Sequence, residues 1–293
     1  MSKWLKWSIL WVGLSLCIYA LLRAPQQLSA MLHNLQPLHW FSLGLVLLLI
    51  WGLSVASWRS YLTAYTGQLP SWRTAIRQLG LLLVGKYLPG GIFGFLARVY
   101  DEAPHSRQAV FWAGLIEQAA GLAMPSVIGA TLYWAATRQQ WAWLLLLLPL
   151  PLLAVHFTVA LHRLSSYLPI LRRYAMPQAP APGLLLKAIS TQFLLLITWA
   201  ALVAVLAQQL FTLSAYAALG IASAFLLAVA AGIIIIIAPG GIGAREAALY
   251  AIASQWLPPA DALLLAAFLR LITSGIDMFA GFLAIFPKIK KLE

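Results

Sequence analysis

The sequence predicts an all-α polytopic membrane protein with six transmembrane helices and two re-entrant helical hairpins, arranged as an inverted-topology repeat. Three observations support this fold class: an apolar composition, a series of apolar runs of membrane-spanning length, and a motif that occurs twice. Of the 293 residues, 62% are hydrophobic and only 9% are charged. Soluble domains do not have this composition, and the mean hydropathy of +0.88 agrees with a membrane protein.

The predicted transmembrane helices are apolar runs, each about as long as the ~20 residues that a spanning helix needs. They are residues 7–22, 40–58, 109–136, 141–161, 184–209 and 261–286. The first run follows Lys3 and Lys6, as the apolar part of a signal peptide would, but no small-residue cleavage site follows it. We therefore expect residues 7–22 to remain as a helix. This run contains the single cysteine, Cys17.

The repeated motif is Pro-Gly-Gly-Ile, which occurs at residues 89–92 and again at residues 239–242. Pro-Gly-Gly interrupts a helix and lets the backbone turn without a side-chain penalty. Inside a bilayer, such backbone is tolerated only where it is buried in protein or lines a wet cavity. We therefore interpret residues 74–100 and 213–254 as re-entrant hairpins with the motif at each tip. Paired interruptions of this kind are typical of transport architectures.

The distribution of basic residues sets the predicted topology. With both termini in the cytoplasm, thirteen Lys and Arg residues lie inside, two lie outside and four lie in the membrane, as the positive-inside rule requires. The first repeat then covers residues 1–140 and the second covers residues 141–293, in opposite orientations. The net charge of +12 is spread over short loops, such as the one that carries Arg59, Arg73 and Arg77, and the chain has no soluble basic domain. Nucleic-acid binding is therefore excluded as an interpretation.

The predicted site is a set of charged residues near the two motifs. A helix that begins after each Pro-Gly-Gly would direct free N–H groups toward an anion. The expected ligands of a phosphate or headgroup are Arg98, Arg245, Arg270 and Lys86, with the backbone of Gly90, Gly91, Gly240 and Gly241. The expected supporting or proton-coupling carboxylates are Glu117, Glu246 and Asp277. Asp277 lies two helical turns after Arg270 and so shares its face.

These charges allow two interpretations. Each charge at the bilayer centre costs about 2.5–3.5 kcal/mol on insertion scales, so a group of them needs partners or a ligand. In one interpretation, arginines and carboxylates only pair with each other and hold the hairpins in place. In the other, some arginines face a cavity and bind a phosphate, which the planar guanidinium suits well. Lys86 could reach the phosphate or extend toward the cytoplasm. Tyr87, Tyr100 and Tyr250 are candidates for cavity donors or for interfacial packing.

Other kinds of chemistry have no support in the sequence. The histidine spacings make no metal site, and no cofactor motif is present. The chain has no phosphate-binding loop of the ATPase kind. We therefore expect a transporter and no catalytic residue, cofactor or metal.

The residues around the second motif resemble a known family. Residues 238–249, which include Arg245 and Glu246, are similar to the signature of the lysylphosphatidylglycerol synthase/flippase-like transmembrane family. Residues 85–92, followed by Arg98, resemble the first-half motif of its stand-alone members, which lack the soluble aminoacyl-transferase domain. The resemblance implies a protein of the bacterial or archaeal cytoplasmic (inner) membrane that moves lipids between leaflets. It also implies a lipid-modifying enzyme or a glycosyltransferase of cell-surface glycan assembly as a partner.

The function predicted from these observations is a lipid translocase, or flippase, for an anionic phosphate-bearing lipid. The cargo would be an aminoacyl-phospholipid, another phospholipid or a polyprenyl-phosphate carrier. One alternative is a secondary transporter of a small anion, which predicts a cavity closed to lipid. Another is a membrane component of lipid-linked glycan assembly, for which Glu117 is the candidate base.

Overall fold

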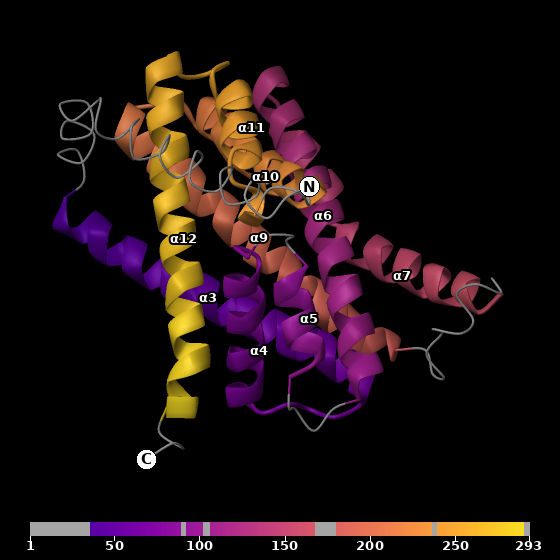
Figure 1. Cartoon of the computed structure of the whole chain (residues 1–293). Helices are drawn as coiled ribbons and strands as arrows, with labels where there is room; N and C mark the ends of the chain where they lie inside the picture. Colours follow the sequence, from indigo (N-terminus) through magenta and orange to yellow (C-terminus); the bar gives the residue numbers. More distant parts are fainter. Residues whose placement is uncertain (1–35, 89–91, 102–105, 168–179, 236–238, 290–293) are drawn as a thin grey trace.

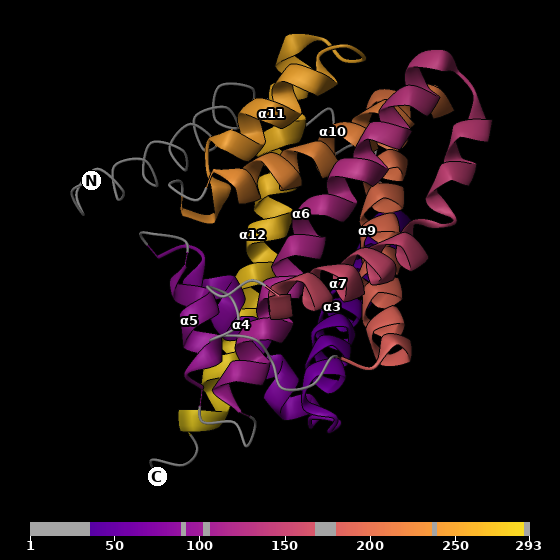
Figure 2. The ribbon, with the colours of Figure 1, turned by 90° about the vertical axis from the view of Figure 1, so that its right-hand side faces the viewer.

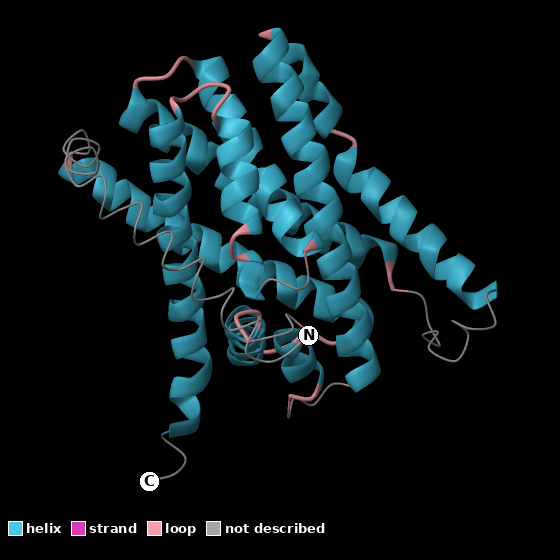
Figure 3. Cartoon of the chain, turned by 45° about the horizontal axis from the view of Figure 1, so that its top comes forward, coloured by secondary structure: helices cyan, strands magenta, loops and turns pink. Residues whose placement is uncertain are grey.

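The computed structural model describes residues 36–88, 92–101, 106–167, 180–235 and 239–289. These residues form helices joined by short connections, and no strand occurs among them (Figure 1 and Figure 3). Six helical stretches in this part of the chain are long and apolar enough to cross a membrane. The described part of the chain is therefore all-helical, and its six apolar helices indicate a multi-pass membrane protein.

The long helices follow the predicted apolar runs and extend beyond most of them. They are α3 (Pro37–Thr66), α6 (Arg107–Arg138), α7 (Leu150–Tyr167), α9 (Pro182–Phe211), α10 (Ala215–Ile234) and α12 (Pro259–Ile289). The predicted run 141–161 is divided into a 3-10 helix, η1 (Trp141–Leu147), and the beginning of α7. Two prolines, Pro149 and Pro151, explain this division because proline cannot donate a helical hydrogen bond. The predicted helix 7–22 lies outside the described residues.

Local side-chain chemistry fixes several helix ends. Ser71, Ser106 and Ser214 cap the starts of α4 (Trp72–Gly85), α6 and α10, and each serine hydroxyl accepts a hydrogen bond from a backbone N–H three residues later. Such caps satisfy N–H groups that would otherwise have no partner. Gly67 ends α3 in the left-handed conformation, with φ of +68°, which glycine adopts without strain.

Each Pro-Gly-Gly segment separates two helices. The first separates α4 (Trp72–Gly85) from α5 (Phe93–Val99), which pack side by side. A Cβ atom on Gly85 would lie 2.2 Å from the Cα atom of Gly94, so only glycine allows this approach. The second separates α10 from η2 (Pro239–Gly241) and α11 (Ala244–Ala253), and α11 packs back on α10.

The segment 213–254 differs in one respect from the predicted hairpin. Its first limb, α10, has 20 residues with a mean hydropathy of 2.4, which is sufficient for a complete span. A 20-residue helix is about 30 Å long, which equals the thickness of the hydrocarbon core. The described structure therefore gives a long helix followed by a short one, where the sequence suggested two limbs of a re-entrant hairpin.

Helix packing joins the beginning and the end of the chain. The most extensive contacts are those of α10 with α6, α3 with α9, and α12 with α4. Small residues make these contacts close: a Cβ atom on Gly80 of α4 would lie 2.4 Å from the carbonyl oxygen of Ala280 in α12. Similarly, a Cβ atom on Gly129 of α6 would lie 2.8 Å from Cγ of Leu227 in α10. Small residues at helix interfaces are the usual basis of packing in membranes.

The two helix–break–helix units lie at different ends of the bundle. In Figure 1 and Figure 2, α4 and α5 occupy the lower part of the molecule, whereas α10 and α11 occupy the upper part. The long helix α12 passes beside both units. The C-terminal end of α4 and η2 (Pro239–Gly241) therefore lie close together in the middle of the molecule, beside α12.

Candidate functional site

The C-terminal end of α4 and η2 are joined directly through their backbones. The backbone N–H of Gly240 donates to the carbonyl oxygen of Lys86 at 2.7 Å. Gly240 has φ of +61°, and a Cβ atom there would lie 3.0 Å from the ring of Tyr87. The Gly240 carbonyl accepts a hydrogen bond from Nη1 of Arg270, on α12, at 3.2 Å. One glycine of η2 therefore links the C-terminal end of α4 to α12.

Lys86 and Tyr87 reach across to one carboxylate on α12. Nζ of Lys86 lies 2.8 Å from Oδ2 of Asp277, and the Tyr87 hydroxyl donates to the same oxygen at 2.6 Å. The Tyr87 hydroxyl also lies 3.3 Å from Oγ of Ser274. The guanidinium carbon of Arg270 lies 5.6 Å from the centre of the Tyr87 ring, within cation–π range. Asp277 is thus satisfied by partners from the first half of the chain.

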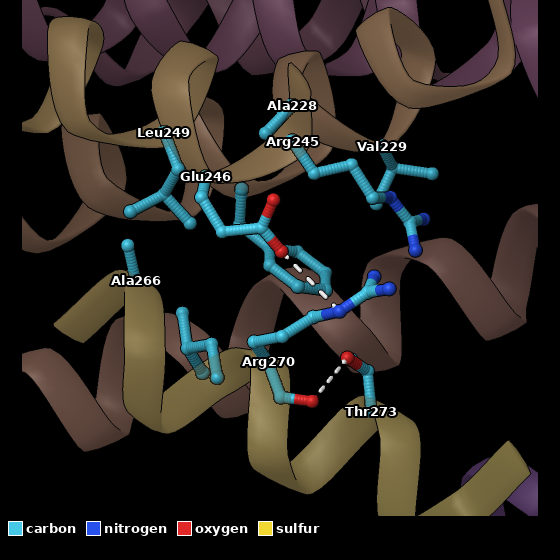
Figure 4. A pocket seen from close by; sticks show the side chains of 10 residues that line it. Ala228, Val229, Arg245, Glu246, Leu249, Ala266, Arg270 and Thr273 are labelled. Carbon is cyan, nitrogen blue, oxygen red and sulfur yellow. Dashed lines mark hydrogen bonds and ion pairs between the residues drawn. The ribbon is translucent and has the colours of Figure 1, made fainter. Parts of the chain in front are cut away.

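Arg270 and Glu246 form the second ion pair of the site. Nε of Arg270 lies 3.2 Å from Oε1 of Glu246, as Figure 4 shows. The other oxygen of Glu246 accepts a hydrogen bond at 2.6 Å from the backbone N–H of Gly243, at the start of α11. The buried Nη2 of Arg270 has no hydrogen-bond partner among the described residues. Glu246 therefore orients Arg270 and leaves one of its donors available.

Arg245 and Arg270 line the same small cavity. No carboxylate in the described part of the chain lies within ion-pairing distance of it, although Glu246 is its neighbour in sequence. Its side chain passes over Gly232, where a Cβ atom would lie 2.4 Å from Cγ of Arg245. In Figure 4 the side chains of Arg245 and Arg270 extend toward each other from α11 and α12.

The cavity between these arginines has a volume of about 30 Å³. This is space for water molecules, and the remaining lining is apolar except for Thr273 and Glu246. Together with Lys86 and Asp277, the site has three cations and two carboxylates, which leaves one net positive charge. We call these five charged residues, with Tyr87 and Gly240, the central cluster.

Arg98 belongs to a second group of residues, which we call the Arg98 cluster. Its side chain is 0% exposed, and its Nη1 forms an ion pair with Glu117 of α6. Its Nε donates to the carbonyl oxygen of Gln78 at 3.2 Å, and its guanidinium lies 3.6 Å from the centre of the Trp58 ring. Gln192 of α9 donates to the Glu117 carbonyl at 3.3 Å. The cluster thus ties α3, α4, α5, α6 and α9 together.

The predicted site residues that the structure describes lie in two separate clusters. Arg245, Arg270, Lys86, Gly240, Glu246 and Asp277 belong to the central cluster, and Gly241 packs against Gly232 beside it. Gly90 and Gly91 lie outside the described residues. Arg98 pairs with Glu117, and none of its described contacts involves the central cluster. The ion-pairing role therefore describes Arg98, whereas Arg245 has no carboxylate partner among the described residues.

Three polar contacts were not anticipated from the sequence. Ser274 lies four residues after Arg270 and three before Asp277, which places all three on one face of α12. This spacing was the sequence signal for its contact with Tyr87. Trp58 and Gln78 lie on helices whose packing against α5 has no sequence signal. Of the three tyrosines considered, Tyr87 lies in the central cluster, whereas Tyr100 and Tyr250 are exposed.

Comparison of the chain with protein-family models, with curated proteins and with solved structures gave no match. The class that fold and composition define is a multi-pass helical membrane protein.

Proposed function

We propose that the protein is a lipid translocase that moves an anionic, phosphate-bearing lipid between the leaflets of a bacterial or archaeal inner membrane. The observation that carries this proposal is the net positive charge of the central cluster. Arg245 lacks a carboxylate partner and Arg270 retains a free Nη2, and both line one cavity. Two guanidinium groups around one space suit the oxygens of a phosphate.

The packing of the helices supports an inverted repeat as the transport architecture. If the two halves are equivalent, α3 corresponds to α9, α4 with α5 to α10 with α11, and α6 to α12. Under this correspondence, the contact of α4 with α12 becomes the contact of α10 with α6, and both are extensive. In the contact of α3 with α9, the two helices exchange places, so this contact is unchanged. Two-fold related halves require this exchange of contacts, and transporters bind cargo where such halves meet.

In the proposed mechanism, the phosphate enters the cavity between Arg245 and Arg270, and the acyl or prenyl chain stays in the bilayer. Glu246 and Asp277 hold Arg270 and Lys86 in position while the site is empty, which reduces the cost of charges within the membrane. The volume of about 30 Å³ is too small for a headgroup, so the halves separate when the cargo binds. Since the sequence has no ATPase motif, transport follows a lipid gradient, the proton gradient or the membrane potential.

The resemblance of residues 238–249 to the lysylphosphatidylglycerol synthase/flippase-like family supports a lipid as the cargo. Aminoacyl-phospholipids, phospholipids and polyprenyl phosphates share the phosphate that the central cluster would bind. The enzyme that makes or uses such a lipid would be the partner, and both termini would lie in the cytoplasm. The protein itself carries no chemical step in this proposal.

The proposal is tested with the full chain in proteoliposomes. The measurement is the rate at which fluorescent phosphatidylglycerol becomes protected from a membrane-impermeant quencher. We expect Arg245→Gln to reduce this rate by roughly 10–100-fold, because a hydrogen bond to a charged group contributes about 1.5–3 kcal/mol. Arg73→Gln is the matched control, since Arg73 is exposed near the start of α4. Equal rates for wild type and Arg245→Gln would contradict the proposal.

One observation favours the second candidate, a secondary transporter of a small anion. The cavity is small, and apolar side chains such as Leu249 and Phe225 form much of its wall. The same proteoliposomes distinguish the two functions: uptake of radiolabelled inorganic phosphate without lipid translocation would favour the small-anion transporter.

A further inference from the structure

A large apolar groove lies between α3 and α12. The two helices touch where the rings of Trp51 and Phe279 meet, with centroids 5.9 Å apart. Away from this contact they diverge, and the groove between them has a volume of about 700 Å³. In Figure 1, α3 and α12 cross at a wide angle, which is consistent with this divergence. The groove extends along α3 from Trp40 to Trp51 and along α12 from Leu271 to Phe279.

The groove faces away from the central cluster. On a helix with about 100° per residue, Arg270, Ser274 and Asp277 share one face of α12. Leu271, Gly275 and Phe279 of the groove wall lie on the opposite side. A single lipid therefore cannot reach both regions without passing around α12.

Two glycines in the groove indicate a helix as its occupant. Gly44 of α3 and Gly275 of α12 both line the groove, and no atom of the described residues lies within 4 Å of the Cβ position of either. Elsewhere in the bundle, glycines at contacts between long helices, such as Gly80, meet a neighbouring helix at this position. Small residues let helix backbones approach closely in a membrane. Gly44 and Gly275 are thus suited to a helix partner that the described residues do not provide.

The second half of the molecule has a helix in the corresponding place. There, η1 packs on α6 and α7 packs on α9. In the proposed repeat, α6 corresponds to α12 and α9 to α3. The space that η1 and α7 occupy therefore corresponds to the groove between α12 and α3.

We propose that residues 7–22 form a helix that docks in the groove between α3 and α12. This inference rests on the repeat that belongs to the proposed function. The segment is apolar and precedes α3 with a connection of 14 residues, which can extend over roughly 45 Å. A 16-residue helix is about 24 Å long, enough to cover the wall from Trp40 to Trp51. Its small residues Gly13, Cys17 and Ala20 share one face and can meet the glycines of the groove.

The docked helix gives α12 a protein neighbour on each side. It would shield the groove face of α12 from lipid and restrict α12 to one position relative to α3. Since α12 carries Arg270 and Asp277, the helix formed by residues 7–22 would then help to position the central cluster by packing on the opposite face of α12. It would do so without contacting the cargo.

The single native cysteine allows a direct test by cross-linking in the full chain. Leu271→Cys and Gly275→Cys place a second thiol in the groove. Leu194→Cys, on α9, is the matched control because Leu194 and Leu271 are 52% and 47% exposed. A protease site is inserted in the linker 174–183, so that cleavage separates Cys17 from each introduced cysteine. Disulfides form only when the two Cα atoms lie within about 7 Å, and a short bismaleimide extends the test to neighbouring registers.

We expect the cleaved halves to stay joined in the Leu271→Cys or Gly275→Cys variants and to separate after reduction. The joined fraction should exceed that of Leu194→Cys several-fold and disappear with Cys17→Ser. Separate halves for both groove variants would overturn the proposal, and so would equal joining in the Leu194→Cys control. Cross-linked dimers of the whole chain would also overturn it, because the groove would then be an interface between copies.

Failure of this test can be told from failure of the proposed function. Lipid translocation is measured on the same preparation before oxidation. Translocation without cross-linking would refute the docked helix alone, whereas cross-linking without translocation would refute the lipid translocase alone.

Discussion

Arg98 and Arg245 follow the two Pro-Gly-Gly motifs at similar spacing, yet their surroundings differ. Arg98 is 0% exposed and is held by Glu117, Gln78 and Trp58. Arg245 lines a cavity and has no carboxylate partner in the described ranges, because Glu246 is bound to Arg270. In the proposed repeat these positions are equivalent, and we propose separate roles for them: Arg98 stabilises the fold, and Arg245 binds an anion.

The difference follows from the neighbouring helix. In the first half, α6 places the carboxylate Glu117 against Arg98. In the second half, α12 places the cation Arg270 beside Arg245. A carboxylate beside arginine gives a closed ion pair, whereas a second cation gives a site that favours an anion. In the proposed repeat, the difference between Glu117 on α6 and Arg270 on α12 therefore separates the two clusters.

The largest expected effect is on stability, from Arg98→Ala. This change leaves the mostly buried carboxylate of Glu117 without its partner, which costs about 3–5 kcal/mol. We expect a marked decrease of the thermal unfolding temperature of the protein in detergent micelles. The double variant with Arg98→Leu and Glu117→Leu should recover much of the loss, because it removes both charges. Wild-type stability of Arg98→Ala together with lost translocation would place Arg98 in the binding site instead.

Stepwise removal of one cation and one carboxylate tests the central cluster. Lys86→Met removes one of its three cations and should weaken anion binding by roughly tenfold, since one ion pair or charged hydrogen bond contributes about 1.5–3 kcal/mol. Adding Asp277→Asn restores the net positive charge and should restore most of the affinity. The measurement is the Kd of a short-chain phosphatidylglycerol. If the double variant bound more weakly than Lys86→Met, Asp277 would have a role other than balancing Lys86.

The smallest effect concerns the glycine that joins the two breaks. Gly240 and Gly67 have similar left-handed backbones, with φ of +61° and +68°, so alanine strains each by about 1–2 kcal/mol. Only at Gly240 would the new Cβ also meet the Tyr87 ring, at 3.0 Å, and Nη2 of Arg270, at 3.3 Å. We expect Gly240→Ala to impair translocation and Gly67→Ala to lower only the unfolding temperature. Equal translocation rates in the two variants would contradict the proposed role of this contact.

Hydropathy located the long helices of the described part of the chain, although the predicted helix 141–161 is divided between η1 and α7. The runs 109–136 and 184–209 lie within α6 and α9, because polar residues and proline delimit them on both sides. The run 40–58 stops short of the end of α3, since Ser57, Arg59 and Thr63 lower the hydropathy while the helix continues to Thr66. A hydropathy pattern indicates which part of a helix lies in an apolar environment. The length of the helix depends instead on its backbone hydrogen bonds and caps.

The pairing of charges could not be obtained from the sequence. Arg98, Arg245, Glu117 and Glu246 were all recognised as charges that need partners, but their partners depend on which helices pack together. Adjacent residues such as Arg245 and Glu246 do not face each other on a helix, and Glu246 binds Arg270, 24 positions later in the chain. The packing of α5 on α6 and of α11 on α12 determines which charges form ion pairs.

The most direct test of the central claim is the affinity of the protein for a soluble phosphate-bearing lipid. Calorimetric titration of the full chain with dihexanoyl phosphatidylglycerol is compared for wild type, Arg245→Gln and Arg73→Gln. We predict that Arg245→Gln raises the Kd by roughly 10–100-fold at unchanged unfolding temperature, while Arg73→Gln leaves the Kd unchanged. An unchanged Kd in Arg245→Gln would contradict the account, because the unpaired arginine would then have no part in binding the anion.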